Sequence, residues 1–263
     1  MSAGAPALSF AMVTTFYPPE SFGGDGRYVE RLSRALVDRG HRVTVLCCHD
    51  AFRICGGSSF AADREERGGP RVVRLRSALG PLSPIVTQAT GLPGLKRARI
   101  QEELGRGFDV VHFHNVSLVG GPGVLGMGRA RVRLYTLHEH WLICPMHVFW
   151  KNRSRLCDRK TCFSCQILSG RPPQLWRAGD SLRKGLANID LLLAPSRFTL
   201  EKHRAEGIDR PAEVLPHFVP EAPARNEPPE RPVFLYAGRL ENSKGVDALL
   251  SAAESGVDAD FRF

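Results

Sequence analysis

Short apolar runs alternate with amphipathic stretches along most of the chain. The first run, at residues 8–13, has the pattern of a buried strand and leads into a loop rich in proline and glycine. Apolar residues then recur at helical spacing from Tyr28 to Leu36, and Gly40 suits the position just past the end of that helix. Further strand-like runs follow at residues 42–46, 71–75, 109–113, 132–137, 191–194 and 213–215.

Two later helical patterns fit between these strands. One lies near residues 95–105, and the other starts after Ser196, whose hydroxyl can cap a helix, and runs to about Gly207. Alternation of strands and helices predicts an α/β, Rossmann-like fold in which a parallel sheet carries helices on both faces. Right-handed crossovers place the loops after the strands on one rim of such a sheet, where ligands bind.

A Pro-rich, charged segment at residues 220–232 interrupts the alternation and has the composition of an interdomain linker. The pattern restarts with a strand at residues 233–237, then a helix, then the beginning of a strand at residues 260–263. These elements are too few to bury a core of their own. We therefore predict a first Rossmann-like domain at residues 1–219 and the start of an incomplete second one at residues 233–263.

The composition is that of an ordinary globular protein, with 43% hydrophobic and 24% charged residues among 263. The formal net charge of +9 favours anionic partners such as nucleotide phosphates or acidic lipids. A general richness in arginine, alanine, glycine and proline explains the charge equally well. Basic residues are not interleaved with aromatic ones in any stretch, so nucleic acid is not an expected partner.

Neither a membrane span nor a secretory signal is visible in the sequence. A span needs ~20 consecutive apolar residues, and no run approaches that length. We therefore expect a cytoplasmic protein whose seven cysteines are reduced or metal-bound. Peripheral contact with the inner face of a membrane stays open.

Three glycines, Gly23, Gly24 and Gly26, form a loop between the first strand and the first helix. Glycines let the backbone approach an anion, and a helix N-terminus offers free N–H donors. The loop lacks the Gly-x-Gly-x-x-Gly fingerprint, so a nicotinamide cofactor is not expected. A flexible surface turn explains these glycines equally well.

Two cations, Arg239 and Lys244, flank a tight loop after the strand that follows the linker. Fixed cations at the C-terminal end of a strand can neutralise a diphosphate and stabilise it as a leaving group. Taken alone, two solvated surface charges would be the simpler interpretation.

Together these motifs resemble the GT-B glycosyltransferases of family 4, which transfer a sugar from a nucleotide donor with retention of anomeric configuration. The matching stretches, in order, are residues 18–24 with 39–45, 109–114, 136–140, 194–196, 215–219, 238–240 and 244–247. The order and spacing of these stretches indicate the family far more specifically than any single motif does. The resemblance extends over nearly the whole chain, but only over roughly the first two-thirds of a usual family member.

The resemblance implies two Rossmann-like domains that face a cleft, the first holding mainly the acceptor and the second mainly the nucleotide sugar. Gly23 and Gly24 would approach the donor phosphates. Arg239 and Lys244 would clamp the diphosphate from the second domain. His138 matches a family histidine near the transferred sugar, where it would orient the sugar or stabilise developing charge.

Two further histidines, His112 and His114, match a family pattern at the end of a central strand. The resemblance places them in the lining of the cleft rather than in catalysis, and a packed structural role is the alternative for any lone histidine. It also implies a UDP-, GDP- or ADP-linked sugar donor, a glycan or lipid-linked acceptor, and chemistry that needs no metal. The implied pathway is assembly of a bacterial-type surface polysaccharide or glycolipid.

Two departures from the family pattern stand out. The second domain of the family also carries paired glutamates that bind the ribose and sugar of the donor, and this motif is absent from the sequence. Glu139 stands where an aspartate is commoner. We therefore expect a truncated enzyme with weak or no transferase activity alone, because both walls of a cleft are needed to stabilise a transition state. A non-catalytic acceptor-binding module that pairs with another chain, and a different phosphate-binding α/β enzyme, are the alternatives.

A short basic stretch carries four cysteines, which are Cys144, Cys157, Cys162 and Cys165. We interpret residues 144–165 as an insertion in the first domain. Nearby cations favour thiolates, and Cys-x-x-Cys spacing is common in tetrahedral zinc sites. The stretch therefore predicts a structural Zn²⁺ site, in which His140 or His147 could replace one cysteine. An iron–sulfur cluster and free thiols are the alternatives.

Overall fold

The computed structural model describes residues 6–65, 68–152, 154–219, 230–238, 240 and 244–262. The chain divides into two compact units, Met1–His217 and Phe218–Phe263. Most of the linker predicted at residues 220–232 lies outside the described residues, as does Arg239. Among the helices that the structure describes, none combines the length and the apolar character needed to cross a membrane.

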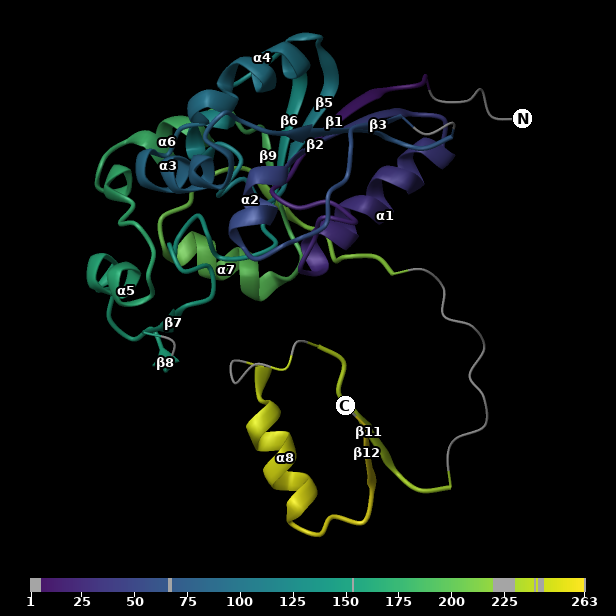
Figure 1. Ribbon diagram of the computed structural model, residues 1–263, viewed down its shortest axis with the longest axis vertical. Helices are drawn as coiled ribbons and strands as arrows, with labels where there is room; N and C mark the ends of the chain where they lie inside the picture. Colours follow the sequence, from purple (N-terminus) through teal and green to yellow (C-terminus); the bar gives the residue numbers. More distant parts are fainter. Residues whose placement is uncertain are drawn as a thin grey trace. The chain divides into compact units, whose positions relative to one another are not determined.

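The described part of the first unit is built around one large sheet, most of whose strands are labelled in Figure 1. The sheet has eight strands in the order β10-β9-β6-β5-β1-β2-β4-β3. The parallel strands are β1 (Ser9–Val13), β2 (Arg42–Cys48), β4 (Arg71–Leu75), β5 (Phe108–Phe113), β6 (Ala130–Thr136), β9 (Leu191–Ala194) and β10 (Ala212–Val214). A short edge strand, β3 (Arg64–Glu65), pairs with β4 in the antiparallel sense. The parallel sheet confirms the predicted α/β class, and each predicted strand lies within two residues of its observed bounds.

The helices of the first unit are α1 (Gly24–Asp38), α2 (His49–Ile54), α3 (Ser83–Thr90), α4 (Arg97–Gly105), α5 (Cys162–Leu168), α6 (Ser181–Leu186) and α7 (Arg197–Ala205). Four 3₁₀ turns are described between them: η1 (Gly80–Leu82), η2 (Gly94–Lys96), η3 (Gly121–Val124) and η4 (Leu175–Ala178). The sequence predicts α1, α4 and α7. It misses the other helices because elements of six to eight residues complete too few turns to establish a helical period.

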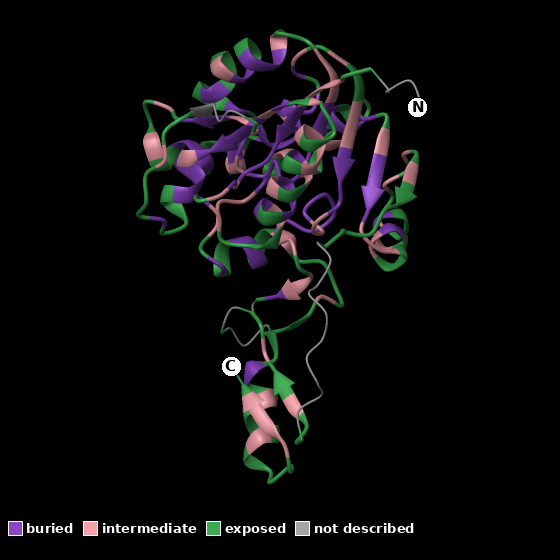
Figure 2. Ribbon diagram, turned by 90° about the vertical axis from the view of Figure 1, so that its right-hand side faces the viewer, coloured by how far each residue is buried: buried purple, intermediate pink, exposed green. Residues whose placement is uncertain are grey.

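Alternate residues of the central strand face two different hydrophobic clusters. Ala11 and Val13 of β1 belong to the larger cluster, whereas Met12 belongs to the smaller one. Leu36 of α1 packs against the smaller cluster, and Leu104 of α4 is part of the larger. Helices therefore cover both faces of the sheet, and buried residues are concentrated in its strands (Figures 1 and 2).

Two predicted helix ends are observed in detail. The hydroxyl of Ser196 accepts a hydrogen bond from the Thr199 amide at 3.2 Å and caps α7. After α1, Gly40 adopts φ +85° and donates its amide to the Val37 carbonyl at 2.8 Å. The left-handed conformation at Gly40 is one that a side chain would strain, so glycine is required there to end the helix.

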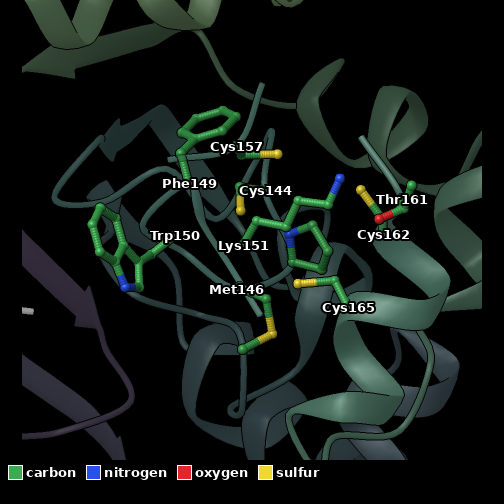
Figure 3. Close-up of a pocket in the computed structure, with 10 residues that line it drawn as sticks. Cys144, Met146, Phe149, Trp150, Lys151, Cys157, Thr161, Cys162 and Cys165 are labelled. Atoms are coloured by element: carbon green, nitrogen blue, oxygen red, sulfur yellow. The ribbon is translucent and has the colours of Figure 1, made fainter. Parts of the chain in front are cut away.

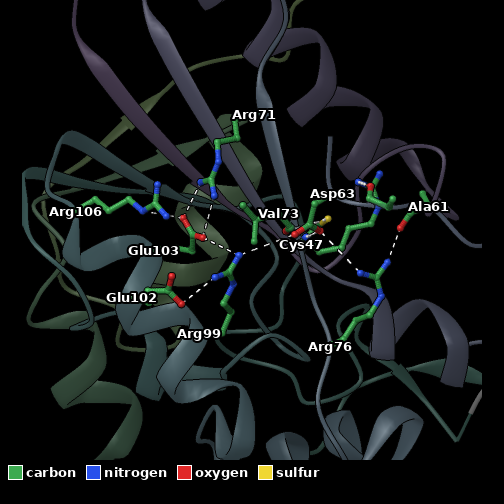
Figure 4. Close-up of polar contacts among 12 residues, drawn as sticks. Cys47, Ala61, Asp63, Arg71, Val73, Arg76, Arg99, Glu102, Glu103 and Arg106 are labelled. Atoms are coloured by element: carbon green, nitrogen blue, oxygen red, sulfur yellow. Dashed lines mark hydrogen bonds and ion pairs between the residues drawn. The ribbon is translucent and has the colours of Figure 1, made fainter. Parts of the chain in front are cut away.

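A fully buried carboxylate joins β4 to α4 (Figure 4). Glu103 accepts two hydrogen bonds from the guanidinium of Arg71, at 2.6 and 3.0 Å. Arg99 and Arg106 lie 3.0 and 3.2 Å from the same carboxylate. The hydrogen bonds and charge of Arg71, with the two neighbouring arginines, hold the pKa of Glu103 below its usual range. Glu103 therefore remains ionised although its side chain has no exposed surface.

The second unit contains a strand, a helix and a further strand, as the sequence predicts. β11 (Val233–Leu235) and β12 (Asp260–Arg262) pair in parallel, and α8 (Val246–Glu254) lies between them in sequence. The rings of Phe234 and Phe261 stack with centroids 5.2 Å apart. Within the described part of this unit, Val246 is the only buried residue.

Candidate functional site

Loops after the central strands meet at one rim of the sheet, because parallel strands end on the same side. The loop after β1 is tied to the loop after β5 by Thr15. Both its backbone amide and its hydroxyl donate to the Asn115 carbonyl, at 2.6 and 2.9 Å. The polar residues that follow each strand are thereby held in fixed positions relative to one another.

Four histidines line up at this rim, and we call His112, His114, His138 and His217 the histidine row. His114 Nδ1 lies 2.9 Å from His138 Nε2, and His138 Nδ1 lies 3.1 Å from His217 Nε2. His112 hydrogen-bonds the Thr136 hydroxyl at 2.7 Å, and its ring centroid lies 4.1 Å from that of His114. The row joins the ends of β5 and β6 to the segment after β10.

The row is held in the neutral state. Burial lowers the pKa of both His112 and His138 to about 3, and it holds the pKa of His114 well below its usual range. A neutral imidazole carries one N–H, so the hydrogen bonds from His114 through His138 to His217 must all run in one direction. A contact that fixes the proton on one ring therefore fixes it on the others.

One ring nitrogen of the row, Nε2 of His114, lacks a hydrogen-bond partner within the described structure. His114 is 1% exposed, and within the described structure its Nε2 makes no hydrogen bond. A buried polar atom left unpaired costs about 1–3 kcal/mol. Such an atom is expected at a site where a ligand completes the hydrogen bond.

Acid is expected to destabilise the protein through this row. The folded-state pKa of His112 lies below its unfolded value near 6.5, so the unfolded chain binds more protons as the pH falls from about 6.5 towards 3. His112 then removes about 1 kcal/mol of stability for each pH unit below 6.5. Urea unfolding at pH 7.5, 6.5 and 5.5 measures this slope. His112→Gln should reduce this slope by about 1 kcal/mol per pH unit, because the other buried histidines of the row still contribute to it. An unchanged slope in His112→Gln contradicts the assignment.

The N-terminal turn of α1 packs against the row. The Tyr28 ring lies 5.3 Å from His138 and 4.1 Å from His217, between ring centroids. At Gly26 an added Cβ would come within 2.4 Å of the Ser21 hydroxyl, so the close packing of the loop requires glycine. At Gly24 a Cβ would meet nothing within 4 Å, so this part of the helix N-terminus is open.

An acidic side chain already occupies part of that helix N-terminus. Asp25 accepts a hydrogen bond from the Gly26 amide at 2.8 Å and one from the Asn115 amide group at 3.4 Å. Burial, and secondarily the charge of Glu139, raise the pKa of Asp25. A phosphate at Gly23 and Gly24 would have to share the turn with this carboxyl group, a feature that the glycine pattern does not reveal.

Glu139 connects the row to the cysteine-bearing segment. Its carboxylate lies 2.6 Å from Nδ1 of His147. The backbone carbonyl of the next residue, His140, accepts a hydrogen bond from the Cys144 amide at 2.7 Å. The His140 amide donates a hydrogen bond to the His147 carbonyl at 2.9 Å. The position of His138 is therefore coupled through adjacent backbone to the fold of residues 140–147.

The structure brings some of the predicted site residues together. Gly23, Gly24 and the predicted histidines lie at one rim, around Tyr28 and Asn115. Lys244 lies two residues before α8 in the second unit and is exposed. Its predicted role with Arg239 in a diphosphate clamp stays a prediction.

Sequence reasoning missed two members of the site. His217 lies in a stretch that carries the family resemblance, but no role follows from its spacing, because it lies 79 residues after His138. The sequence pattern identifies Tyr28 only as an apolar position of the first helix. An aromatic residue in the first turn of a helix that follows a glycine loop is the signal that could have drawn attention to it.

The four predicted zinc ligands lie around one cavity, which is lined by Cys144, Cys157, Cys162 and Cys165 among others. Neither suggested histidine lines it. His147 pairs with Glu139, and the His140 ring packs 5.3 Å from both Phe149 and His203. Among the residues described, no group of three or more His, Cys, Asp or Glu side chains is placed so that it could hold a metal ion.

Comparison with known proteins identifies the family. The model of glycosyltransferase family 4 matches residues 22–222. An "uncharacterized 42.6 kDa protein in cps region" of Klebsiella pneumoniae is 24% identical over 268 residues, which cover 94% of this chain and 65% of that protein. The chain thus spans just under two-thirds of the length of this curated relative. Among solved structures, CalG4, the calicheamicin glycosyltransferase, matches 88% of this chain and 57% of its own, with 17% identity and a TM-score of 0.43.

The family match includes both the glycine loop and three strands that end at the histidine row. It extends over residues 22–222, which is most of the 263-residue sequence. The chain belongs to glycosyltransferase family 4.

Proposed function

We propose that the chain forms the acceptor-side part of a retaining glycosyltransferase, which transfers a sugar from a nucleotide sugar to a hydroxyl group of a glycan or lipid-linked acceptor. The observation that carries this proposal is the hydrogen-bonded row His114–His138–His217 beside the open N-terminus of α1. Family membership supports the reaction class. A fold of this type hosts many reactions, so the argument rests on the site.

The protonation state of the row limits what His138 can do. With a pKa of about 3, His138 is neutral near pH 7 and is a weak proton acceptor. We therefore assign it a hydrogen-bonding role, in which its Nδ1 exchanges His217 for a hydroxyl group of the transferred sugar. The histidine would then orient the sugar as the acceptor hydroxyl attacks the anomeric carbon and the nucleoside diphosphate departs. Orientation and electrostatic stabilisation of the leaving group would supply most of the rate.

The second unit would contribute the positive charge for the leaving group. Lys244, with Arg239, is our candidate for holding the diphosphate, and the open turn at Gly24 is the candidate for approaching it from the first unit. The donor is expected to carry UDP, GDP or ADP. The relative from a cps region supports a surface polysaccharide as the product. For this synthesis we propose a cytoplasmic location with peripheral membrane contact.

Removing the charge of Lys244 tests whether this residue binds the diphosphate of the donor. Calorimetric titration of a panel of nucleoside diphosphates and their sugars should identify one base that binds the chain. Lys244→Ala should weaken that binding by about tenfold or more, because a charge-assisted hydrogen bond is lost. The exposed Lys184 supplies the matched control, since Lys184→Ala removes the same charge from the other unit. If both variants weaken binding equally, the effect comes from the net charge of the protein and not from Lys244 itself. If no member of the panel binds the chain, the proposed function is contradicted.

A further inference from the structure

A small cavity in the first unit gathers four cysteines that the sugar-transfer proposal does not use. Cys157 follows a short strand, β8 (Arg155–Leu156), whereas Cys162 and Cys165 lie one turn apart on α5. With Cys144 they line a cavity of about 20 Å³, and Figure 3 shows the four sulfur atoms around it. All four thiols are free rather than joined in disulfides. Separate parts of the chain thus bring sulfur donors to one space.

The size and chemistry of this space suit a single metal ion. A cavity of about 10–15 Å³ already accommodates one water molecule, so 20 Å³ admits an ion but no organic ligand. Four thiolates in a tetrahedron are a characteristic ligand set of structural zinc, and the Cys162–Cys165 spacing is typical of it. Among the described residues, no group of three or more His, Cys, Asp or Glu side chains is placed to hold a metal ion. A zinc ion in this cavity would therefore require the cysteine side chains to turn their sulfur atoms towards it.

Charges and hydrogen bonds around the cavity complement a zinc–thiolate centre. Zn²⁺ with four thiolates carries a net charge of −2, and two cations lie nearby. Lys151 lines the cavity and is 8% exposed, and Arg177 lies within electrostatic range of Cys144 and Cys162. The Asn152 amide donates a hydrogen bond to the Cys165 sulfur at 3.5 Å. Donors of this kind surround metal-bound sulfur and orient it.

The backbone of the segment that bears the cysteines is strained. His147, Phe149 and Asn152 have φ of +74°, +52° and +51°, and they are the only non-glycine residues with positive φ in the described chain. Such conformations are unfavourable by about 1–3 kcal/mol each and persist only where the surroundings enforce them. The strands that the structure describes in this stretch are β7 (Trp150–Lys151) and β8, which pair through two residues each. A metal cross-link would help to hold this backbone in its strained conformation.

We propose that Cys144, Cys157, Cys162 and Cys165 bind one Zn²⁺ ion, which closes residues 144–165 into a fixed loop. Each thiol releases its proton as its sulfur coordinates the ion. The metal thereby fixes the loop whose His147 holds Glu139, one residue after His138. The zinc centre is a positioning element for the candidate sugar site, and its existence does not depend on the sugar-transfer proposal.

Metal analysis tests this assignment directly. The chain, purified without chelator and dialysed against excess Zn²⁺ and then against metal-free buffer, should retain about one zinc per chain. Cys162→Ser and Cys165→Ser should each retain about a tenth of that or less, because a three-thiolate site is far weaker. Cys55→Ser is the matched control, since Cys55 is an exposed thiol outside the cavity, and it should retain the full amount.

A second measurement decides the matter if the cysteine variants do not fold. Zinc is removed from the wild-type chain with a chelator and returned in the presence of a chromophoric competitor, and the stoichiometry is read from the colour change. Protease cleavage within residues 144–165 should be at least about tenfold faster in the metal-free chain. Equal zinc in wild type and Cys162→Ser, no zinc uptake by the stripped chain, or a disulfide between any two of the four cysteines by mass spectrometry overturns the proposal.

Discussion

Replacing Glu103 with glutamine is expected to lower the free energy of unfolding by about 3 kcal/mol. The substitution keeps the shape of the side chain but removes the buried charge that Arg71 grips through two hydrogen bonds and that two further arginines approach. The glutamine side chain also presents an amide NH₂ group to the guanidinium groups. Both groups are hydrogen-bond donors, so they cannot pair. The three arginines then lose the buried anion that they share, although Arg99 keeps its exposed partner Glu102. Repulsion between the guanidinium groups therefore weakens the connection between β4 and α4.

The neighbouring Glu102 provides the control for this prediction. It lies on the same helix, pairs with Arg99 at 2.8 Å and is 57% exposed, so Glu102→Gln should change stability by less than about 1 kcal/mol. Urea unfolding of both variants at pH 7 gives the comparison. Similar losses in the two variants would mean that the buried cluster contributes no more than a surface ion pair.

Replacing His138 with alanine is expected to weaken the binding of the nucleotide sugar by about 10- to 100-fold. The change removes the ring that links His114 to His217, so the proton direction along the row is no longer fixed and the sugar loses its hydrogen-bonding partner. Binding of the corresponding nucleoside diphosphate should change by less than about twofold, because His138 is assigned to the sugar alone.

Calorimetry with the two ligands separates this role from a structural one. His41→Ala serves as the control, since His41 accepts a hydrogen bond from the Leu8 amide and packs against Phe10 away from the row. It should leave the affinity for both ligands unchanged. If His138→Ala weakens both ligands equally, the histidine acts through the fold of the rim instead of through the sugar.

Much of the fold is predictable because parallel strands buried on both faces appear in the sequence as continuous apolar runs. The strand bounds at residues 71–75 and 191–194 agree with the structure without adjustment. Short helices such as α2 and α6 are held by tertiary packing, with little periodicity of their own, so a sequence pattern does not reveal them. Buried polar clusters are equally invisible, because Arg71 and Glu103 are 32 residues apart and meet only in the folded chain.

The site is predictable only in part for a related reason. The positions of His112, His114 and His138 at strand ends follow from the strand pattern and the family resemblance. Their mutual hydrogen bonds and their neutral state depend on burial, which spacing does not give. The carboxyl group of Asp25 at the N-terminus of α1 is a further case, since a glycine loop indicates an anion site whether or not an acidic residue occupies part of it.

The central claim is that the histidine row is the wall of the first unit that contacts the sugar of a bound nucleotide sugar. Imidazole resonances followed by NMR during titration with the nucleotide sugar identified by calorimetry test it most directly. The account predicts that the signals of His138 and His217 shift saturably with the affinity measured by calorimetry, while that of His41 stays in place. Saturable binding that leaves every resonance of the row unmoved would contradict it.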